Sequence, residues 1–151
     1  TLFPYTTLFR SLKFTRAVID ETMRLYPPAF LIARAAGGPD TIEGRPVRKH
    51  DVILIAPWLL HRHEKLWRDP NAFVPQRFMT GTPPDRFAYL PFGVGARVCI
   101  GAHFALVEAT LALAKIIGAF RVALADKDPV IPIGVVTTQP NRSPVFTIKP
   151  R

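Results

Sequence analysis

The segment PFGVGARVCIG, residues 91–101, contains the only cysteine of this 151-residue chain. Glycines at positions 93, 95 and 101 surround Cys99 and allow the backbone to turn tightly and to approach a flat object closely. A long apolar stretch follows, so Cys99 stands at the start of an expected helix, where unpaired N–H groups and the helix dipole favour a thiolate. A thiolate in such a bend is suited to bind a soft metal carried by a planar cofactor.

Two other interpretations of Cys99 stay open on these residues alone. Cysteine side chains are often simply buried in a core. Cys99 could also be a nucleophile activated by His103, one helical turn later, although no third residue that would orient His103 is evident. That arrangement would make the protein a Cys–His hydrolase.

The composition narrows the class of protein. One cysteine excludes an internal disulfide framework, fits a reducing cytoplasm, and argues against a structural zinc site or an iron–sulfur cluster. The formal net charge of +9 is compatible with a basic nucleic-acid-binding module, but the basic residues are scattered. A basic face for an acidic protein partner explains the charge equally well. No continuous apolar run approaches the ~18 residues of a membrane span, so no membrane segment is expected.

The pattern of apolar residues and turns predicts a mainly helical α+β fold. A helix within residues 12–28 is stopped by Pro27 and Pro28, because the residue before a proline avoids the α region. The segment 100–120 is apolar almost all round, which is typical of a central, buried helix. The other expected elements are an antiparallel hairpin within 40–57 with turns at 44–45 and 49–51, a short helix at 58–66, an irregular meander at 68–92, and short strands at 120–124, 130–138 and 145–149.

The first residues of the chain, TLFPYTTLFRS, have a different expected origin. Read back through the genetic code, they match without a mismatch a string that resembles a widely used sequencing-library adapter. We therefore interpret residues 1–11 as a translated adapter and expect the natural sequence to start near Leu12. A membrane anchor or a further motif upstream of Leu12 stays open.

Three motifs resemble those of the cytochromes P450. The spacing Phe-x-x-Gly-x-Arg-x-Cys-x-Gly at residues 92–101 resembles the haem-thiolate signature of that family. ETMR at residues 21–24 resembles its ExxR motif, and PQRF at residues 75–78 resembles its PERF motif, with Gln76 in place of the usual glutamate. The resemblance covers residues 12–151.

The resemblance implies the C-terminal portion of a single P450 domain. Its elements would be the ExxR helix, a small β-hairpin, the meander, the Cys-ligand loop, a long buried helix and a C-terminal β-hairpin. The implied cofactor is haem b, with Cys99 as the axial thiolate ligand of its iron and Phe92 shielding the sulfur. Gly95 would shape the bend, Gly101 would let the helix pass close to the porphyrin, and Arg97 would pair with a haem propionate.

Further roles follow from the same resemblance. Arg34 is expected to pair with the second propionate. Glu21, Arg24 and Arg77 are expected to form a buried Glu–Arg–Arg triad that ties the meander to the core, which is tolerable only if the charges are fully paired. The residues expected to line the substrate pocket follow the ExxR helix or lie at the tip of the C-terminal hairpin: Ala29, Phe30, Leu31, Val135 and Val136.

The implied activity of the parent protein is that of a monooxygenase, which inserts one atom of O2 into a small apolar organic substrate. Electrons would come from NAD(P)H through a ferredoxin, flavodoxin-type or reductase partner, and the basic balance near Cys99 favours an acidic one. No nucleic-acid partner is implied, and a cytoplasmic, bacterial location is expected. The oxygen-activating helix precedes the ExxR helix in this family and is absent after Leu12. The chain alone is therefore expected to be inactive and to bind haem weakly. It also cannot bury the apolar helix at 100–120 by itself, so aggregation is expected.

Two histidines and two tryptophans are further candidates for cofactor contacts. His61 and His63 are two positions apart and lie on different faces of a helix, so we expect solvated or capping roles rather than metal binding. Trp58 and Trp67 are expected to pack against other side chains.

Overall fold

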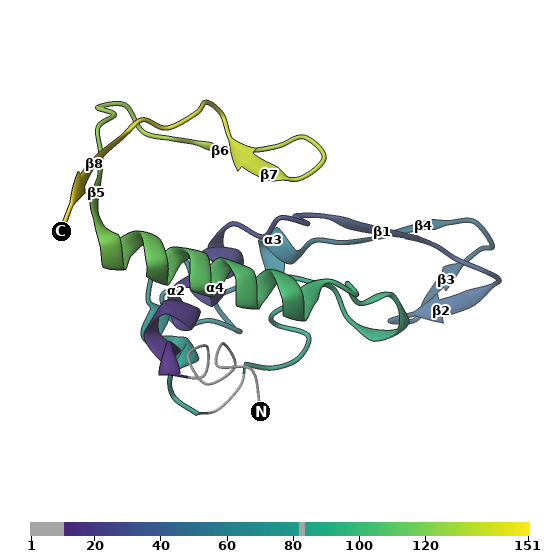
Figure 1. The fold of residues 1–151 in the computed structure, drawn as a ribbon. Helices are drawn as coiled ribbons and strands as arrows, with labels where there is room; N and C mark the ends of the chain where they lie inside the picture. The colour runs from purple at the N-terminus through teal and green to yellow at the C-terminus, as the bar shows by residue number, and fades with distance from the viewer. Residues whose placement is uncertain (1–10, 82–83) are drawn as a thin grey trace.

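The computed structural model describes residues 11–81 and 84–151, so the adapter interpretation of residues 1–11 falls almost wholly outside the described part. Helices α2 and α4 lie against each other, and strand pairs project from them (Figure 1). This mixture of helices and strands agrees with the predicted α+β class. The elements in chain order are α2 (Lys13–Leu25), β1 (Ile32–Ala35), β2 (Asp40–Ile42), β3 (Arg45–Val47), β4 (Val52–Ile55), α3 (Pro57–Leu60), the 3-10 helices η1 (Pro75–Phe78) and η2 (Gly95–Arg97), α4 (Ala102–Ala119), β5 (Phe120–Leu124), β6 (Pro132–Gly134), β7 (Thr138–Pro140) and β8 (Phe146–Pro150).

Helix α2 ends where the sequence predicts. Tyr26 follows its last residue and donates its N–H to Thr22 O, and Pro27 then has no N–H with which to continue the helix. The buried face of α2 is rich in charge, so its partners must come from other segments. Its buried residues are Ala17, Asp20, Glu21, Arg24 and Leu25.

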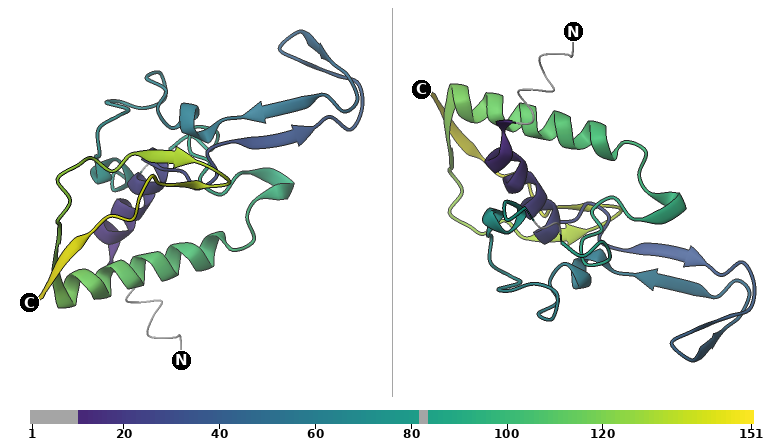
Figure 2. Two further views of the ribbon diagram at one scale, coloured as in Figure 1. Left: turned by 90° about the horizontal axis from the view of Figure 1, so that it is seen from above. Right: turned by 90° about the horizontal axis from the view of Figure 1, so that it is seen from below.

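The strands form antiparallel pairs. The ladders are β1–β4, β2–β3, β5–β8 and β6–β7. The turn between β2 and β3 places Glu43 (φ 49°) and Gly44 (φ 73°) in the left-handed region, as a type I′ hairpin requires. The β2–β3 pair continues the β1–β4 ladder away from the helices (Figure 2). The predicted hairpin is therefore present, and β1 lengthens it.

Two hydrogen bonds join the C-terminal hairpin β6–β7 to the segment that follows α2. The Thr138 N–H donates to Pro28 O (3.0 Å), and its hydroxyl donates to Pro27 O (2.6 Å). These bonds bring two segments more than a hundred residues apart in sequence into contact. The space between these two segments is the cavity described below.

The expected helix at 58–66 is shorter than predicted. Helix α3 spans Pro57–Leu60, and turns follow it. In a continuing helix the His61 carbonyl would accept the Lys65 N–H. Instead His61 O accepts a bond from Arg24 Nη1 (2.6 Å), and the Lys65 N–H donates to His63 Nδ1 (3.2 Å). A tertiary contact with α2 therefore replaces further helical turns.

Helix α4 has the predicted position but is not buried. Thr110 is its only buried residue, while Phe104 and Ile116 are exposed. In the described part of the chain its main helical contact is with α2, which covers one face (Figure 2). This exposure agrees with the expectation that the chain alone cannot bury this helix, because a helix that is apolar all round needs cover on every side.

Helix α4 bears on the expectation that the visible chain has no membrane segment. It has 18 residues with a mean hydropathy of 1.5, so by length and composition it could cross a membrane. Polar residues such as Glu108 and Lys115 interrupt this helix, so it contains no continuous apolar run of that length. Core helices of other proteins have the same length and composition, so this property is weak support for a membrane span.

Candidate functional site

The Cys99 segment is a bend closed by backbone hydrogen bonds. Gly93 (φ 72°) and Gly95 (φ 75°) have left-handed conformations that other residues rarely adopt, so the bend itself requires them. The Gly93 N–H donates to Leu90 O (3.2 Å), and the Cys99 N–H donates to Phe92 O (2.9 Å). Phe92, expected to shield the sulfur, thus also holds the bend through its carbonyl group.

The Cys99 side chain is exposed beside the first turn of α4. Its Sγ lies 3.8 Å from where a Cβ at Gly101 would be. The first N–H groups of α4 lack helical acceptors, so the sulfur lies beside unpaired donors of the backbone. Val98 and Ile100 on either side are exposed apolar side chains. An exposed sulfur between apolar side chains fits a flat, apolar cofactor that supplies the remaining ligands of its metal.

The two arginines expected at the haem propionates come from different elements. Arg97 lies in η2 and is exposed, and Arg34 lies in β1, where its Nη1 donates to the neighbouring Ala33 O (2.8 Å). Strand β1 runs beside the bend, since Ile32 Cδ1 lies 4.0 Å from a Cβ built on Gly93. Ile32 and Arg34 share one face of β1 because side chains alternate along a strand. Arg34 is thus on the face of β1 that touches the bend.

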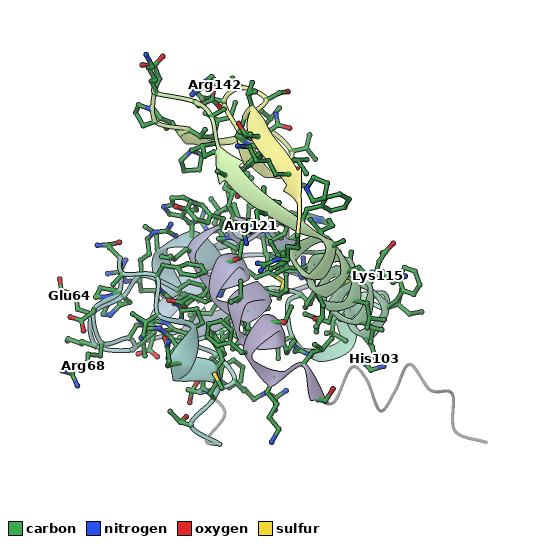
Figure 3. The ribbon with its side chains drawn as sticks, turned by 60° about the vertical axis from the view of Figure 1, so that its left-hand side comes forward. Glu64, Arg68, His103, Lys115, Arg121 and Arg142 are labelled. Atoms are coloured by element: carbon green, nitrogen blue, oxygen red, sulfur yellow. The ribbon has the colours of Figure 1, made fainter. Side chains whose placement is uncertain are left out.

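His103, which the hydrolase interpretation requires, lies in the first turn of α4 and is exposed. His103 and Lys115 lie on the side of α4 turned away from α2 (Figure 3). Both side chains lie where solvent or another protein segment can reach them.

An apolar cavity of about 330 Å³ lies between the segment after α2 and the hairpin β6–β7. Phe30, expected in the substrate pocket, lines it. Leu31 is exposed, Ala29 is half-buried, and Val135 and Val136 form the exposed hairpin tip. The other cavity-lining residues are Trp58, Pro132, Ile133, Gly134 and Thr138. Ile133, Gly134 and Thr138 belong to the segment 133–138, which the resemblance predicts to reach the pocket, whereas Trp58 and Pro132 were not predicted.

We expect Gly134→Ala to change this cavity. The new Cβ would lie 2.8 Å from Phe30 Cζ, so the Phe30 ring must shift. The affinity of the full-length protein for an apolar ligand that fills the cavity should fall roughly tenfold, with a stability cost of about 1 kcal/mol. Ligand titration measures the affinity. Gly118→Ala in α4 is the control, because nothing lies within 4 Å of its Cβ. Unchanged affinity in Gly134→Ala would contradict this placement of Phe30.

The structure brings Glu21, Arg24 and Arg77 together. Arg24 Nε and Nη2 donate to the two carboxylate oxygens of Glu21 (2.7 and 2.9 Å), and both side chains are fully buried. Arg77 Nε, from η1, lies 3.2 Å from Glu21 Oε1, which also accepts the Val74 N–H (2.7 Å). Gln76 is exposed, so its departure from the usual glutamate does not disturb this cluster.

Arg24 also binds the loop backbone directly. Its remaining N–H groups donate to three carbonyl oxygens, of His61 (2.6 Å), Pro70 (2.7 Å) and Ala72 (3.0 Å). Burial alone would raise the pKa of Glu21, but the hydrogen bonds from Arg24 and Val74 and the nearby arginine charges outweigh it and hold that pKa below its usual value. Glu21 is therefore ionised at neutral pH, and its charge orders the meander.

His61 belongs to this cluster, and the expectation of a solvated side chain is wrong for it. Its ring is completely buried, because turns after α3 place it against α2. Nδ1 lies 3.1 Å from Arg24 O, a carbonyl at the end of α2, so the capping part of the expectation does describe its position. His63 is exposed. Trp67 packs as expected, against Phe78 and Tyr89.

The His61 environment predicts a pH dependence of stability. Burial and the charges of Arg24 and Arg62 lower its pKa to about 4, from 6.5. Between these values the unfolded chain binds a proton that the folded chain does not, so stability falls as the pH falls. The free energy of unfolding of the full-length protein should drop by up to about 3 kcal/mol over this window.

Denaturant titrations at a series of pH values measure this slope. Glu21, whose pKa is depressed, contributes its own loss of stability only below its ordinary value of 4.5. The window from 6.5 to 4.5 therefore isolates the histidine. His61→Gln cannot titrate and should flatten the curve there; an identical slope in His61→Gln and wild type would refute the assignment.

Comparisons with known proteins agree with this geometry. The family model described as Cytochrome P450 matches residues 4–145. Cytochrome P450 3A27 of Oncorhynchus mykiss is 38% identical over 112 residues, which are 73% of this chain and 22% of that protein. Cyclooctatin synthase of Streptomyces melanosporofaciens is 41% identical over 112 residues, 73% of this chain and 24% of that protein. Dimethylnonatriene synthase of Arabidopsis thaliana is 36% identical over 124 residues, 80% of this chain and 24% of that protein. The chain thus spans about a quarter of the length of these relatives.

Proposed function

Because this chain belongs to the cytochrome P450 family, we propose that it is the haem-binding portion of a haem-thiolate monooxygenase. The full protein inserts one atom of O2 into an apolar organic substrate. The observation that carries the proposal is the exposed Cys99 sulfur, in a glycine-shaped bend at the start of α4. Membership of this family does not fit a Cys–His hydrolase or a nucleic-acid-binding module.

Residues of the bend and of strand β1 would hold haem b. Cys99 would ligate the haem iron through its exposed sulfur, and the exposed apolar side chains of Val98 and Ile100 on either side of it would contact the cofactor. Arg97 and Arg34 bind the propionates, since a guanidinium pairs with a carboxylate through two parallel hydrogen bonds. When bound through a thiolate, haem supplies O2 activation, because the ligand pushes electron density toward the iron.

The apolar cavity beside Phe30 and Trp58 supports an apolar substrate. Electrons reach the haem from NAD(P)H through a ferredoxin, flavodoxin-type or reductase partner, and the net charge of +9 supports an acidic one. The single cysteine supports a cytoplasmic location. We also propose that residues 12–151 are the C-terminal portion of the protein, with the oxygen-activating helix upstream, so that the chain alone is inactive.

The test is spectroscopic and uses the full-length protein expressed with haem. After reduction and addition of CO, the Soret band should take the shifted position of a thiolate-ligated haem. A protein that binds no haem, or whose CO complex has the band of a haem without a thiolate, would contradict the proposal.

A further inference from the structure

The buried imidazole of His61 connects the charged cluster to the bend that carries Cys99. Its Nε2 accepts the Leu90 N–H (2.8 Å), and its Nδ1 lies 3.1 Å from Arg24 O. His61 is 0% exposed, and Leu90 is also buried. The ring is shielded from solvent, so its two nitrogens depend on protein partners for their hydrogen bonds.

These partners fix the tautomer of the ring. A backbone N–H can only donate, so Nε2 carries no proton, and a carbonyl can only accept, so Nδ1 carries one. The ring is therefore neutral, a donor toward α2 and an acceptor toward Leu90. A proton on Nε2 would face the Leu90 N–H donor to donor.

The two hydrogen bonds of the His61 ring join Arg24, in the charged cluster, to Leu90, at the start of the Cys99 bend. On one side, Arg24 Nη1 donates to His61 O (2.6 Å), so each side chain binds the backbone of the other residue. On the other side, Leu90 O accepts the Gly93 N–H, and Phe92 O accepts the Cys99 N–H. The backbone at Leu90 is thus where the bend begins.

A second contact supports the same docking. The Tyr89 ring lies 5.4 Å from the His61 ring, and its hydroxyl donates to Asp20 Oδ1 (3.0 Å). Two adjacent residues, Tyr89 and Leu90, are therefore attached to α2, one directly and one through His61. The bend is built outward from this pair.

We propose that His61 is a positioning residue for the thiolate: its hydrogen bond to Leu90 fixes the start of the Cys99 bend relative to the Glu21–Arg24 pair. The inference rests on the proposed function, since the thiolate matters only if it binds haem. A purely structural core histidine would affect stability alone, whereas a positioning histidine also sets how firmly the sulfur stays on the iron.

Two substitutions separate the two hydrogen bonds. A glutamine oxygen reaches about as far as Nε2, so His61→Gln retains an acceptor for Leu90. An asparagine amide reaches about as far as Nδ1, so His61→Asn retains the donor to Arg24 O and loses the acceptor. Thr110→Val in α4 is a matched control, because Thr110 is fully buried and the change removes its side-chain hydrogen bond to Leu106 O (2.6 Å) without touching the residues of the bend.

The experiment compares these variants in the full-length, haem-loaded protein at equal haem content. Hydrogen exchange of the peptide containing Leu90 should accelerate about tenfold in His61→Asn, the effect of one lost hydrogen bond, and stay near wild type in His61→Gln. The fraction of the reduced CO complex without thiolate ligation should rise several-fold in His61→Asn only. Thr110→Val should lower stability without changing that fraction.

The outcomes separate the two proposals. If wild type has the thiolate spectrum and His61→Asn keeps it as firmly as His61→Gln does, His61 is a packing residue and the inference is wrong. The inference also fails if Thr110→Val loses the thiolate to the same extent as His61→Asn. A wild-type protein without a thiolate spectrum would overturn the proposed function itself, and the inference with it.

Discussion

Cys99→Ser is expected to eliminate the thiolate spectrum and to reduce substrate turnover of the full-length protein to background, while the fold is retained. The side chain is exposed, and the bond that closes the bend uses the Cys99 backbone N–H rather than its sulfur. A serine hydroxyl is not ionised at neutral pH and is a harder ligand, so it cannot replace the soft thiolate. The CO spectrum and a turnover assay measure the two losses.

Ala96→Ser is the matched control for this substitution. Ala96 lies in η2 of the same bend and is exposed, so the change adds a hydroxyl there without removing the sulfur. It should keep both the spectrum and the turnover. Cys99→Ser protein with a thiolate-type Soret band would show that another residue ligates the iron.

Arg24→Ala is expected to lower the free energy of unfolding by about 3–5 kcal/mol, enough to leave much of the protein unfolded. The substitution leaves the Glu21 carboxylate buried with only Arg77 and Val74 as partners. It also deprives three loop carbonyls of their donor. Arg24→Lys should recover little of the loss, because an ammonium group cannot provide the same planar set of donors. Urea unfolding measures these differences.

The same helix offers a control. Arg16 pairs with Asp20 through Nε (2.7 Å), but the Arg16 side chain is 33% exposed. Arg16→Ala should cost only about 0.2–1 kcal/mol, as partly exposed ion pairs do. An Arg24→Ala variant that loses no more free energy of unfolding than Arg16→Ala would contradict this prediction. The Glu21 carboxylate would then be hydrated in the variant, and the cluster would not hold the meander.

The parts predicted correctly from the sequence are those with local causes. Pro27 stops α2 wherever the rest of the chain lies. The turn predicted at 44–45 lies one residue earlier, at Glu43–Gly44, and depends on backbone conformation alone. The contact between Glu21 and Arg24 is likewise local, since residues three apart share a helix face. The glycines at residues 93 and 95 predicted a tight bend before Cys99, and both have the left-handed conformation that the bend requires.

The parts that were missed depend on contacts distant in the chain. His61 resembles a surface histidine in its local sequence, and its burial follows from Leu90, 29 residues later. In the hairpin β6–β7 the tip residues Val135 and Val136 were expected to line the pocket, whereas the cavity is lined by residues on either side of the tip, Ile133, Gly134 and Thr138.

The bonds that Arg24 makes with the loop carbonyls have a consequence for folding kinetics. They join residues 37 to 48 positions apart, so the chain must close long loops before Arg24 gains its partners. Helix α2 and its internal Glu21–Arg24 pair can form early, while the meander wraps around the guanidinium late. Substitutions at Arg24 should therefore act mainly by accelerating unfolding, with a small effect on the folding rate. Resistance to unfolding over time, rather than the speed of folding, is then the property that this buried arginine controls.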